Sequence, residues 1–215
     1  MTALAPRQPA RDCALCPRLS GFRHANRAAF PDWHNAPVPS FGDAAAALLI
    51  VGLAPGLRGA NRTGRPFTGD YAGDLLYATL PRYGLAEGTY GARPDDGLRL
   101  TNCRITNAVR CVPPENRPTG PEVTACRDFL EGEIAALAGL KAILALGTVA
   151  HGAVIASFGV RKSHFPFAHG ALHSMEGGIT VADSYHCSRY NTNTRRLTEV
   201  MFHAVFERLL PLIGR

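Results

Sequence analysis

The sequence predicts an α/β fold in which a central four-stranded, mainly parallel sheet lies between two layers of helices. Four short apolar runs bounded by turn residues are typical of buried parallel strands, and segments with apolar residues at helical spacing separate them along the chain. Because strands that alternate with helices form right-handed crossovers, both faces of the sheet become covered. We therefore expect a three-layer α/β/α architecture.

One domain spanning residues 1–215 is expected, because a chain of 215 residues suffices for one well-buried core and no second block is large enough to fold alone. Residues 1–12 are expected to form a mobile tail. Residues 13–42 are rich in proline, aromatic and polar residues and show no sustained hydrophobic periodicity. This predicts an irregular segment that needs a cross-link to the rest of the domain to be ordered. No apolar run approaches the roughly 20 residues of a membrane span, and the N-terminus lacks a secretory pattern. We expect a cytoplasmic protein without membrane contact.

The predicted elements follow one another in a regular order. The apolar runs predict strands over residues 47–53, 104–109, 141–146 and 178–185. Helices are predicted over residues 71–83 and from Pro121 to Leu137, and Thr148 is expected to cap a third. A closing helix is predicted over residues 194–212, with a buried face made by Leu197, Val200, Met201, Val205 and Leu209.

Three loops, at residues 52–70, 110–118 and 186–193, each follow a predicted strand. Because parallel strands end at the same edge of a sheet, we expect these loops to meet there and to form the active site. The first loop is rich in glycine and leads from a strand into a helix, which places backbone N–H groups around a ligand. Its spacing matches neither G-x-x-x-x-G-K-[ST] nor G-x-G-x-x-G, so a nucleoside triphosphate or a dinucleotide is disfavoured.

Side chains in these loops carry reactive or binding groups, and each also has an ordinary structural interpretation. Asp70 could orient water or cap the helix that follows it. Phe67 could stack on a planar base or belong to the core, and His186 could donate a hydrogen bond to a ligand or to a neighbouring carbonyl. Residues 188–196 combine hydroxyls, amides and three arginines, which suits phosphate groups as well as a solvated loop.

Six cysteines in a protein expected to be intracellular favour a metal site or catalysis over a disulfide framework. Cys13 and Cys16 form a C-x-x-C pair, and Cys111 and Cys126 form a second, wider pair. Four thiolates can hold either zinc or a [4Fe–4S] cluster, and the spacing does not decide between them. Cys126 also lies on the apolar face of its predicted helix, where a cysteine is often buried without any ligand.

The chain is basic, with 23 Lys and Arg against 17 Asp and Glu, a formal net charge of +6 and a pI near 9.2. Such an excess suits a polyanion such as nucleic acid, although many basic proteins bind none. The charge therefore permits a nucleic-acid partner without requiring one.

Four blocks stand out in this order along the chain: CALCPRL at 13–19, GLAPGLRGANRTGRPFTGD at 52–70, NAVRCVPPENRPTGPEVTAC at 107–126 and SYHCSRYNTNTRRLT at 184–198. Together they resemble the uracil-DNA glycosylase superfamily, most closely its family 5, the type B iron–sulfur glycosylases of bacteria and archaea. The resemblance covers most of the chain and implies removal of uracil, and of hypoxanthine or other deaminated bases, from DNA. It also implies a structural [4Fe–4S] cluster that pins residues 13–42, held by Cys13, Cys16, Cys111 and Cys126.

The resemblance implies catalytic roles for three residues. Sister families place an acid or amide where this chain has Gly56, so water activation is expected to move to Asp70, assisted by Asn116. His186 is expected to donate a hydrogen bond to the departing base, on which negative charge grows as the glycosidic bond breaks.

It also implies two sets of binding residues. Phe67 is expected to stack on a base flipped out of the duplex, and the side chain of Asn107 to meet the polar edge of that base. Backbone groups of Gly52, Ala54 and Gly56 should complete the base pocket. The loop after His186 is expected to enter the minor groove, with Tyr190 or Asn191 as the wedge. The DNA-binding set is Ser188, Arg189, Tyr190, Asn191 and Arg195.

The partner expected from the resemblance is double-stranded or single-stranded DNA containing uracil, bound by a monomer at the nucleoid of a prokaryotic cell. Three other functions are weighed beside it. A hydrolase of free nucleotides would act on a free deoxyuridine nucleotide and leave duplex intact. A non-catalytic module would bind the modified base without creating an abasic site. An iron–sulfur redox protein would be reduced reversibly at physiological potentials.

Overall fold

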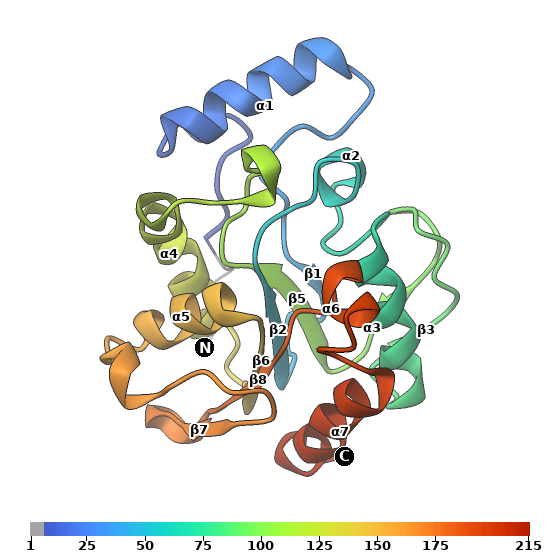
Figure 1. Ribbon diagram of the computed structural model, residues 1–215, viewed down its shortest axis with the longest axis vertical. Helices are drawn as coiled ribbons and strands as arrows, with labels where there is room; N and C mark the ends of the chain where they lie inside the picture. Colours follow the sequence, from blue (N-terminus) through green and yellow to red (C-terminus); the bar gives the residue numbers. More distant parts are fainter. Residues whose placement is uncertain (1–6) are drawn as a thin grey trace.

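A six-stranded sheet forms the centre of the computed structural model, which describes residues 7–215 (Figure 1). The strand order is β1-β5-β2-β6-β8-β7, with four parallel inner strands and an antiparallel strand at each edge. The inner strands are the four predicted ones, which confirms the α/β/α class. The predicted count of four is wrong, since six strands of the described residues form the central sheet: β1 Phe41–Gly42, β2 Leu48–Gly52, β5 Cys103–Asn107, β6 Ala142–Leu146, β7 Leu172–Ser174 and β8 Thr180–Ser184.

The two edge strands escape prediction because they are short. β1 has two residues and β7 has three, too few for an alternating pattern to show. Each is held by antiparallel pairing with an inner neighbour, β5 or β8. A separate two-stranded sheet pairs β3 (Ala86–Glu87) with β4 (Arg99–Leu100).

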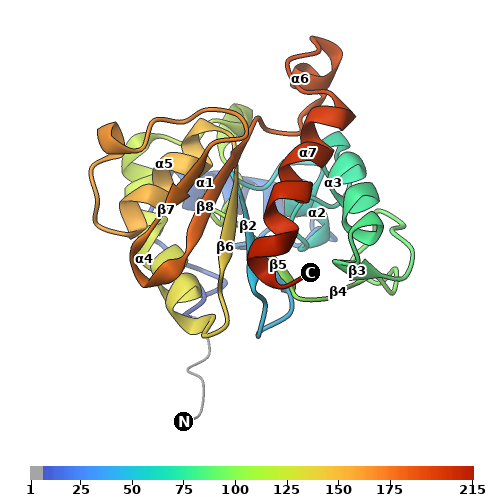
Figure 2. The same ribbon diagram turned by 90° about the horizontal axis from the view of Figure 1, so that it is seen from below.

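Helices cover both faces of the sheet (Figure 2). The inner strands need cover on both faces, as β2 illustrates. All residues of β2 are buried, and its successive side chains point to opposite faces of the sheet. Leu48 and Ile50 belong to one core cluster, whereas Leu49 and Val51 belong to the other. The first cluster packs against α3 (Tyr71–Arg82) and α7 (Glu199–Leu209), and the second against α4 (Gly120–Ala136) and α5 (Thr148–Ser157).

Residues 13–42, predicted to be irregular, contain the helix α1 (Pro17–Ala29). Its buried residues are Leu19, Arg23 and Asn26, which have helical spacing. Two of these three are polar, so the apolar period that identifies a helix in a sequence is absent. The buried polar side chains bond instead to nearby protein groups, as when Arg23 Nη2 donates to the Cys13 carbonyl at 2.8 Å.

Two predicted helix starts are also wrong. Gly147 rather than Thr148 is the N-cap of α5, with a φ of +94° that favours glycine. The closing helix α7 begins at Glu199, where Thr198 Oγ1 accepts a hydrogen bond from Met201 N at 3.2 Å.

The segment before α7 forms a short separate helix, α6 (Arg189–Asn193), after which the chain turns at Arg195 with a φ of +56°. The predicted buried face is confirmed at Leu197, Val205 and Leu209 and is wrong at Val200, which is 79% exposed. Phe202 and Phe206 are also buried.

The predicted tail lies partly on residues 1–6, which are outside the described residues. Within residues 7–12, Gln8 Nε2 donates to Glu133 Oε2 at 3.0 Å. Glu133 is fully buried on α4 and pairs with Arg110 Nη2 at 2.9 Å, so this stretch contacts a buried ionic group. No helix within residues 7–215 is long and apolar enough to cross a membrane. The remaining short helices are α2 Ala60–Thr63, η1 Pro114–Asn116, η2 Lys162–His164, η3 Glu176–Gly178 and η4 Leu210–Ile213.

Candidate active site at the carboxyl edge of the sheet

A cavity of about 670 Å³ lies where the loops after β2, β5 and β8 meet. This is the sheet edge at which the sequence places the site, since parallel strands share their carboxyl ends. Among the predicted residues, Gly52, Tyr190, Asn191 and Arg195 are outside the cavity lining. The cavity is lined by these predicted residues: Ala54, Gly56, Phe67, Asp70, Asn107, Asn116, His186, Ser188 and Arg189.

Gly52 ends β2 directly behind the cavity wall. A Cβ atom at this position would lie 2.5 Å from Asn107 Oδ1 and 2.5 Å from Phe67 Cζ. Only glycine therefore lets the Asn107 amide and the Phe67 ring sit against the strand end. Asn107 itself is 3% exposed at the end of β5 and lines the cavity.

Asp70 is the N-cap of α3, and its Oδ1 accepts a hydrogen bond from Gly73 N at 3.1 Å. Its other oxygen, Oδ2, faces the glycine-rich loop, because Cβ atoms built on Gly56 and Gly59 would lie 3.2 Å and 2.7 Å from it. Burial raises the pKa of Asp70 above its usual value. One carboxylate oxygen is thus anchored while the other borders the cavity, an arrangement suited to a general base.

His186 follows β8 and lines the same cavity from the opposite loop. Burial lowers the pKa of His186 to about 4, so the imidazole is neutral at pH 7 and can donate a hydrogen bond through one N–H. Its carbonyl accepts from Asn191 Nδ2 at 2.8 Å, which folds the following loop back onto it. The next residue, Cys187, donates its S–H to the Ala72 carbonyl at 3.4 Å and ties this loop to α3.

Phe67 provides an aromatic wall next to His186, with ring centroids 5.9 Å apart and planes 25° apart. Its φ of +54° lies in the left-handed region, which costs a side-chain-bearing residue of order 1–3 kcal/mol. Tyr90 Oη donates to the Phe67 carbonyl at 3.3 Å and helps to hold this conformation. Two residues earlier, Arg65 forms a buried two-point ion pair with Asp96 at 2.8 Å and 2.6 Å.

The family model of the uracil DNA glycosylase superfamily matches residues 39–210. The chain belongs to this superfamily. It is 46% identical over 208 residues to a type-5 uracil-DNA glycosylase of Thermus thermophilus, with 94% of each chain covered. It is also 41% identical over 210 residues to a type-5 uracil-DNA glycosylase of Mycobacterium leprae, covering 94% of this chain and 92% of the relative.

A type-4 uracil-DNA glycosylase of Sulfurisphaera tokodaii is more distant, with 32% identity over 176 residues, 79% of this chain and 73% of the relative. The resemblance to the uracil-DNA glycosylase superfamily, and to its family 5, is thereby confirmed.

The predicted DNA-binding segment of this superfamily member forms α6, which projects from the body of the protein (Figure 2). Tyr190 is 72% exposed on this helix. The other predicted wedge residue, Asn191, donates a side-chain hydrogen bond to the His186 carbonyl. Of the two, Tyr190 is therefore the one whose side chain can extend into DNA. Arg189 lies over the Tyr71 ring at 5.4 Å, and both line the cavity.

Arg58 and Tyr71 are cavity residues that sequence reasoning missed. The arginine within the glycine-rich loop could have indicated Arg58. Asn116, by contrast, was predicted and lies exposed at the rim in η1, with a φ of +56°.

The four cysteines predicted as ligands in this superfamily member line one small cavity between α1 and α4: Cys13, Cys16, Cys111 and Cys126. Burial raises the pKa of Cys16 to about 11 and that of Cys111 to about 12. Two hydrogen-bond donors reach the sulfurs, since Arg23 Nη1 lies 3.3 Å from Cys111 Sγ and the Arg110 backbone N lies 3.4 Å from Cys126 Sγ. Segments far apart in the sequence thus bring four sulfurs together.

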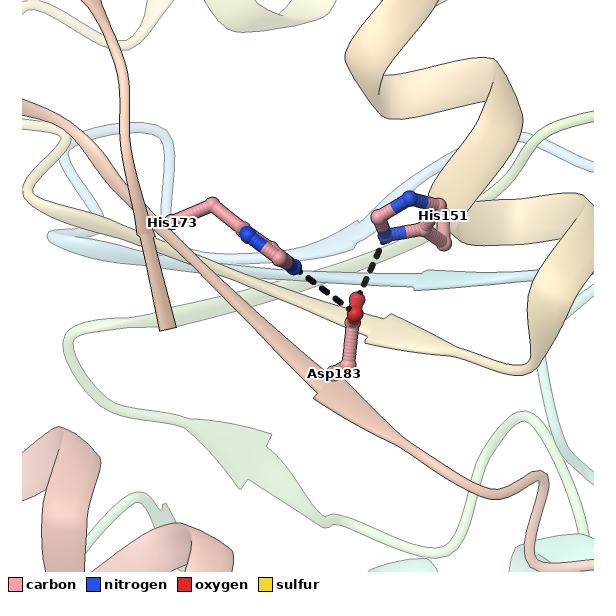
Figure 3. A group of neighbouring side chains, drawn as sticks. All are labelled: His151, His173 and Asp183. Atoms are coloured by element: carbon pink, nitrogen blue, oxygen red, sulfur yellow. Dashed lines mark hydrogen bonds and ion pairs between the residues drawn. The ribbon is translucent and has the colours of Figure 1, made fainter. Parts of the chain in front are cut away.

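A cluster of two histidines and a buried aspartate lies outside the active-site cavity and was not predicted from the sequence. Asp183 on β8 is fully buried and accepts from His151 Nδ1 on α5 at 2.7 Å and from His173 Nε2 on β7 at 3.0 Å (Figure 3). His151 Nε2 also donates to the Phe165 carbonyl at 2.8 Å. These hydrogen bonds connect α5 and β7 to β8. Because Asp183 lies three residues before His186, they hold the end of β8 in place.

Proposed function

We propose that this protein excises uracil from double-stranded and single-stranded DNA by hydrolysing the N-glycosidic bond, and that it leaves an abasic site. Hypoxanthine and other deaminated bases are proposed as further substrates. The observation that carries this proposal is a single cavity that brings together the Asp70 carboxylate, the neutral His186 imidazole and the Phe67 ring. The type-5 relatives, named as uracil-DNA glycosylases, support the same reaction.

The cavity suits a base that has left the duplex. A stacked base cannot present its glycosidic bond, so the nucleotide must be flipped out at a cost of a few kcal/mol. Stacking on Phe67 and hydrogen bonds to the Asn107 amide and to backbone groups near Gly56 offset this cost. Tyr190, exposed on the projecting helix α6, fills the space that the base vacates.

Hydrolysis then requires two groups on opposite sides of the bond. The C1′–N bond breaks with its electron pair on the base, and the His186 N–H donates a hydrogen bond to the base oxygen on which charge develops. Water adds to C1′ and gives its proton to Asp70 Oδ2, while Asn116 at the rim helps to orient this water. The products are the free base and an abasic sugar.

The test uses matched duplexes that carry uracil, hypoxanthine or no lesion. Purified protein should yield strand breaks at uracil only after alkaline treatment, because a hydrolytic glycosylase leaves the backbone intact. Cleavage without alkali would contradict the monofunctional reaction. Absence of any alkali-labile product, together with hydrolysis of a free deoxyuridine nucleotide, would point to a nucleotide hydrolase instead.

We further propose that the four cysteines hold a structural [4Fe–4S] cluster. Arg23 Nε is buried without a hydrogen-bond partner among the described residues, and its cation lies beside the sulfurs, where it would offset the charge of a four-thiolate cluster.

Replacing Cys126 by alanine is expected to remove the cluster. Iron content should fall from about four atoms per chain to near zero, with loss of the brown absorption. The midpoint of thermal unfolding should fall by about 10 °C or more, because metal binding contributes several kcal/mol to folding and each kcal/mol shifts the midpoint by ~2–4 °C at this size. Cys103→Ala is the matched control, since Cys103 is buried in β5 away from the four-cysteine cavity and should retain iron. Zinc in place of iron in the wild-type protein would contradict the proposal.

A further inference from the structure

A second cavity, of about 580 Å³, borders α2, the short helix that also borders the active site. The N-terminal part of α2 borders the active site through Gly59 and Ala60, whereas its C-terminal part borders the second cavity through Arg62 and Thr63. The loops at residues 32–34 and 92–94 complete the second cavity, which has no lining residue in common with the first. We call it the arginine groove.

The lining contains three arginines, Arg11, Arg62 and Arg93, and one carboxylate residue, Asp32. Arg93 is 71% exposed, and its pairing with Asp95 at 3.5 Å is a surface contact that leaves the guanidinium available. Burial lowers the pKa of His34, so the positive charge of the groove at neutral pH comes from arginine. Such a site attracts an anion with several negative charges.

An aromatic platform lies in the same groove. Trp33 lines it and stacks on Phe30, with ring centroids 4.0 Å apart and planes 9° apart. Stacking on Phe30 fixes the orientation of the indole. Arginines beside a rigid aromatic ring are the combination that protein channels for nucleic-acid strands use, because phosphates pair with the cations and bases stack on the ring.

The groove and the active site are close enough to share one strand. Residues 59 and 63 are four apart on α2, which is ~6 Å along a helix axis, and a DNA strand advances ~3.4 Å per nucleotide. We propose that the arginine groove binds the DNA strand that carries the flipped nucleotide, about two nucleotides or more to one side of it. This inference rests on the proposed function, since it assigns the position of the same substrate.

The test compares two double variants that each remove two positive charges. Arg62→Ala/Arg93→Ala removes cations of the groove. Arg99→Ala/Arg161→Ala removes exposed arginines outside both cavities, and Arg99 resembles Arg93 in being exposed and 3.5 Å from an acid. The dissociation constant of an abasic-site duplex is measured over a series of salt concentrations. The groove variant should reduce the slope of log Kd against log salt by about 2, roughly one for each lost phosphate contact.

The control variant should keep the wild-type slope, and both should keep the wild-type rate of excision at saturating enzyme. Asp32→Asn should change binding in the opposite direction and tighten it, because it removes the carboxylate that repels phosphate. Shortening the DNA to two nucleotides on one side of the lesion should reduce wild-type affinity to that of the groove variant, and shortening the other side should not.

Equal slopes for the two double variants would overturn the proposal, as would weaker binding by Asp32→Asn. Equal effects of shortening on either side would also overturn it. Binding is measured without excision, so undamaged duplex gives the same comparison of slopes if the protein releases no base. Failure of the groove and failure of the proposed reaction are therefore distinguishable.

Discussion

Replacing Asp70 by asparagine is expected to lower the rate of uracil excision by about 10²–10⁴-fold, the usual contribution of a positioned general base. Asparagine removes the charge that accepts the proton of water. It keeps the N-cap of α3, because asparagine and aspartate cap helices about equally well, so the bond from Gly73 N is retained. Affinity for uracil duplex should stay near the wild-type value. The measurement is the single-turnover rate at saturating enzyme, with binding measured separately.

Asp74→Asn is the matched control, because Asp74 lies exposed on the same helix, outside the cavity lining, and should leave the rate unchanged. Burial raises the pKa of Asp70, so the wild-type rate should increase with pH through a midpoint above the usual aspartate value of 3.8. This acid limb should be missing in Asp70→Asn. An equal loss of binding and rate, or an equal loss in Asp74→Asn, would contradict the general-base role.

The raised pKa of Asp70 also affects the stability of the folded protein. A carboxyl whose pKa is higher in the folded than in the unfolded state binds more protons when the protein is folded. The stability that Asp70 contributes is therefore present at low pH and is lost as pH rises above 3.8 and passes the pKa of the folded state. Asp70→Asn should therefore be at least as stable as the wild-type protein at pH 7. The proposed general base is thus a carboxylate whose charged form opposes folding.

Replacing His186 by alanine is expected to lower the single-turnover rate by about 10²–10³-fold, as removal of one oxyanion donor usually does. Substrate binding should change much less, because the hydrogen bond strengthens only as negative charge develops on the base. His186→Gln should restore part of the rate, since its amide N–H can donate. His164→Ala is the control, because His164 is exposed on η2 and outside the cavity lining.

The pH dependence separates a neutral donor from a cationic acid at His186. Its pKa is lowered to about 4 by burial, so titration of His186 should cause no change in rate between about pH 6 and 8. The lowered value also means that the unfolded chain binds the proton more readily. The stability associated with His186 is fully present above pH 6.5 and is lost as pH falls toward 4. The stability of His186→Ala should not decrease in this way over the same pH range. A rate inflection near pH 6.5 that disappears in His186→Ala would contradict the neutral imidazole.

The inner sheet and the rim of the site could be predicted because their physical causes are local. A strand buried on both faces must be apolar throughout, as at Leu48–Gly52, and parallel strands must deliver their following loops to one edge. The order of strands and loops along the chain therefore suffices to predict that Asp70 and His186 share one site. The helix α1 could not be predicted, because Arg23 and Asn26 occupy the buried face that an apolar pattern would mark.

The sequence by itself determined the fold class, the edge at which the site lies and the residue types available for chemistry, since these follow from local patterns of apolar residues, turns and reactive side chains. Only the tertiary structure decided which distant residues meet. It brings His151, His173 and Asp183 into one hydrogen-bonded group, and it places the Asp32 loop and Arg93 in one groove with α2. It also decides protonation, because the pKa of His186 depends on burial by segments that no local pattern contains.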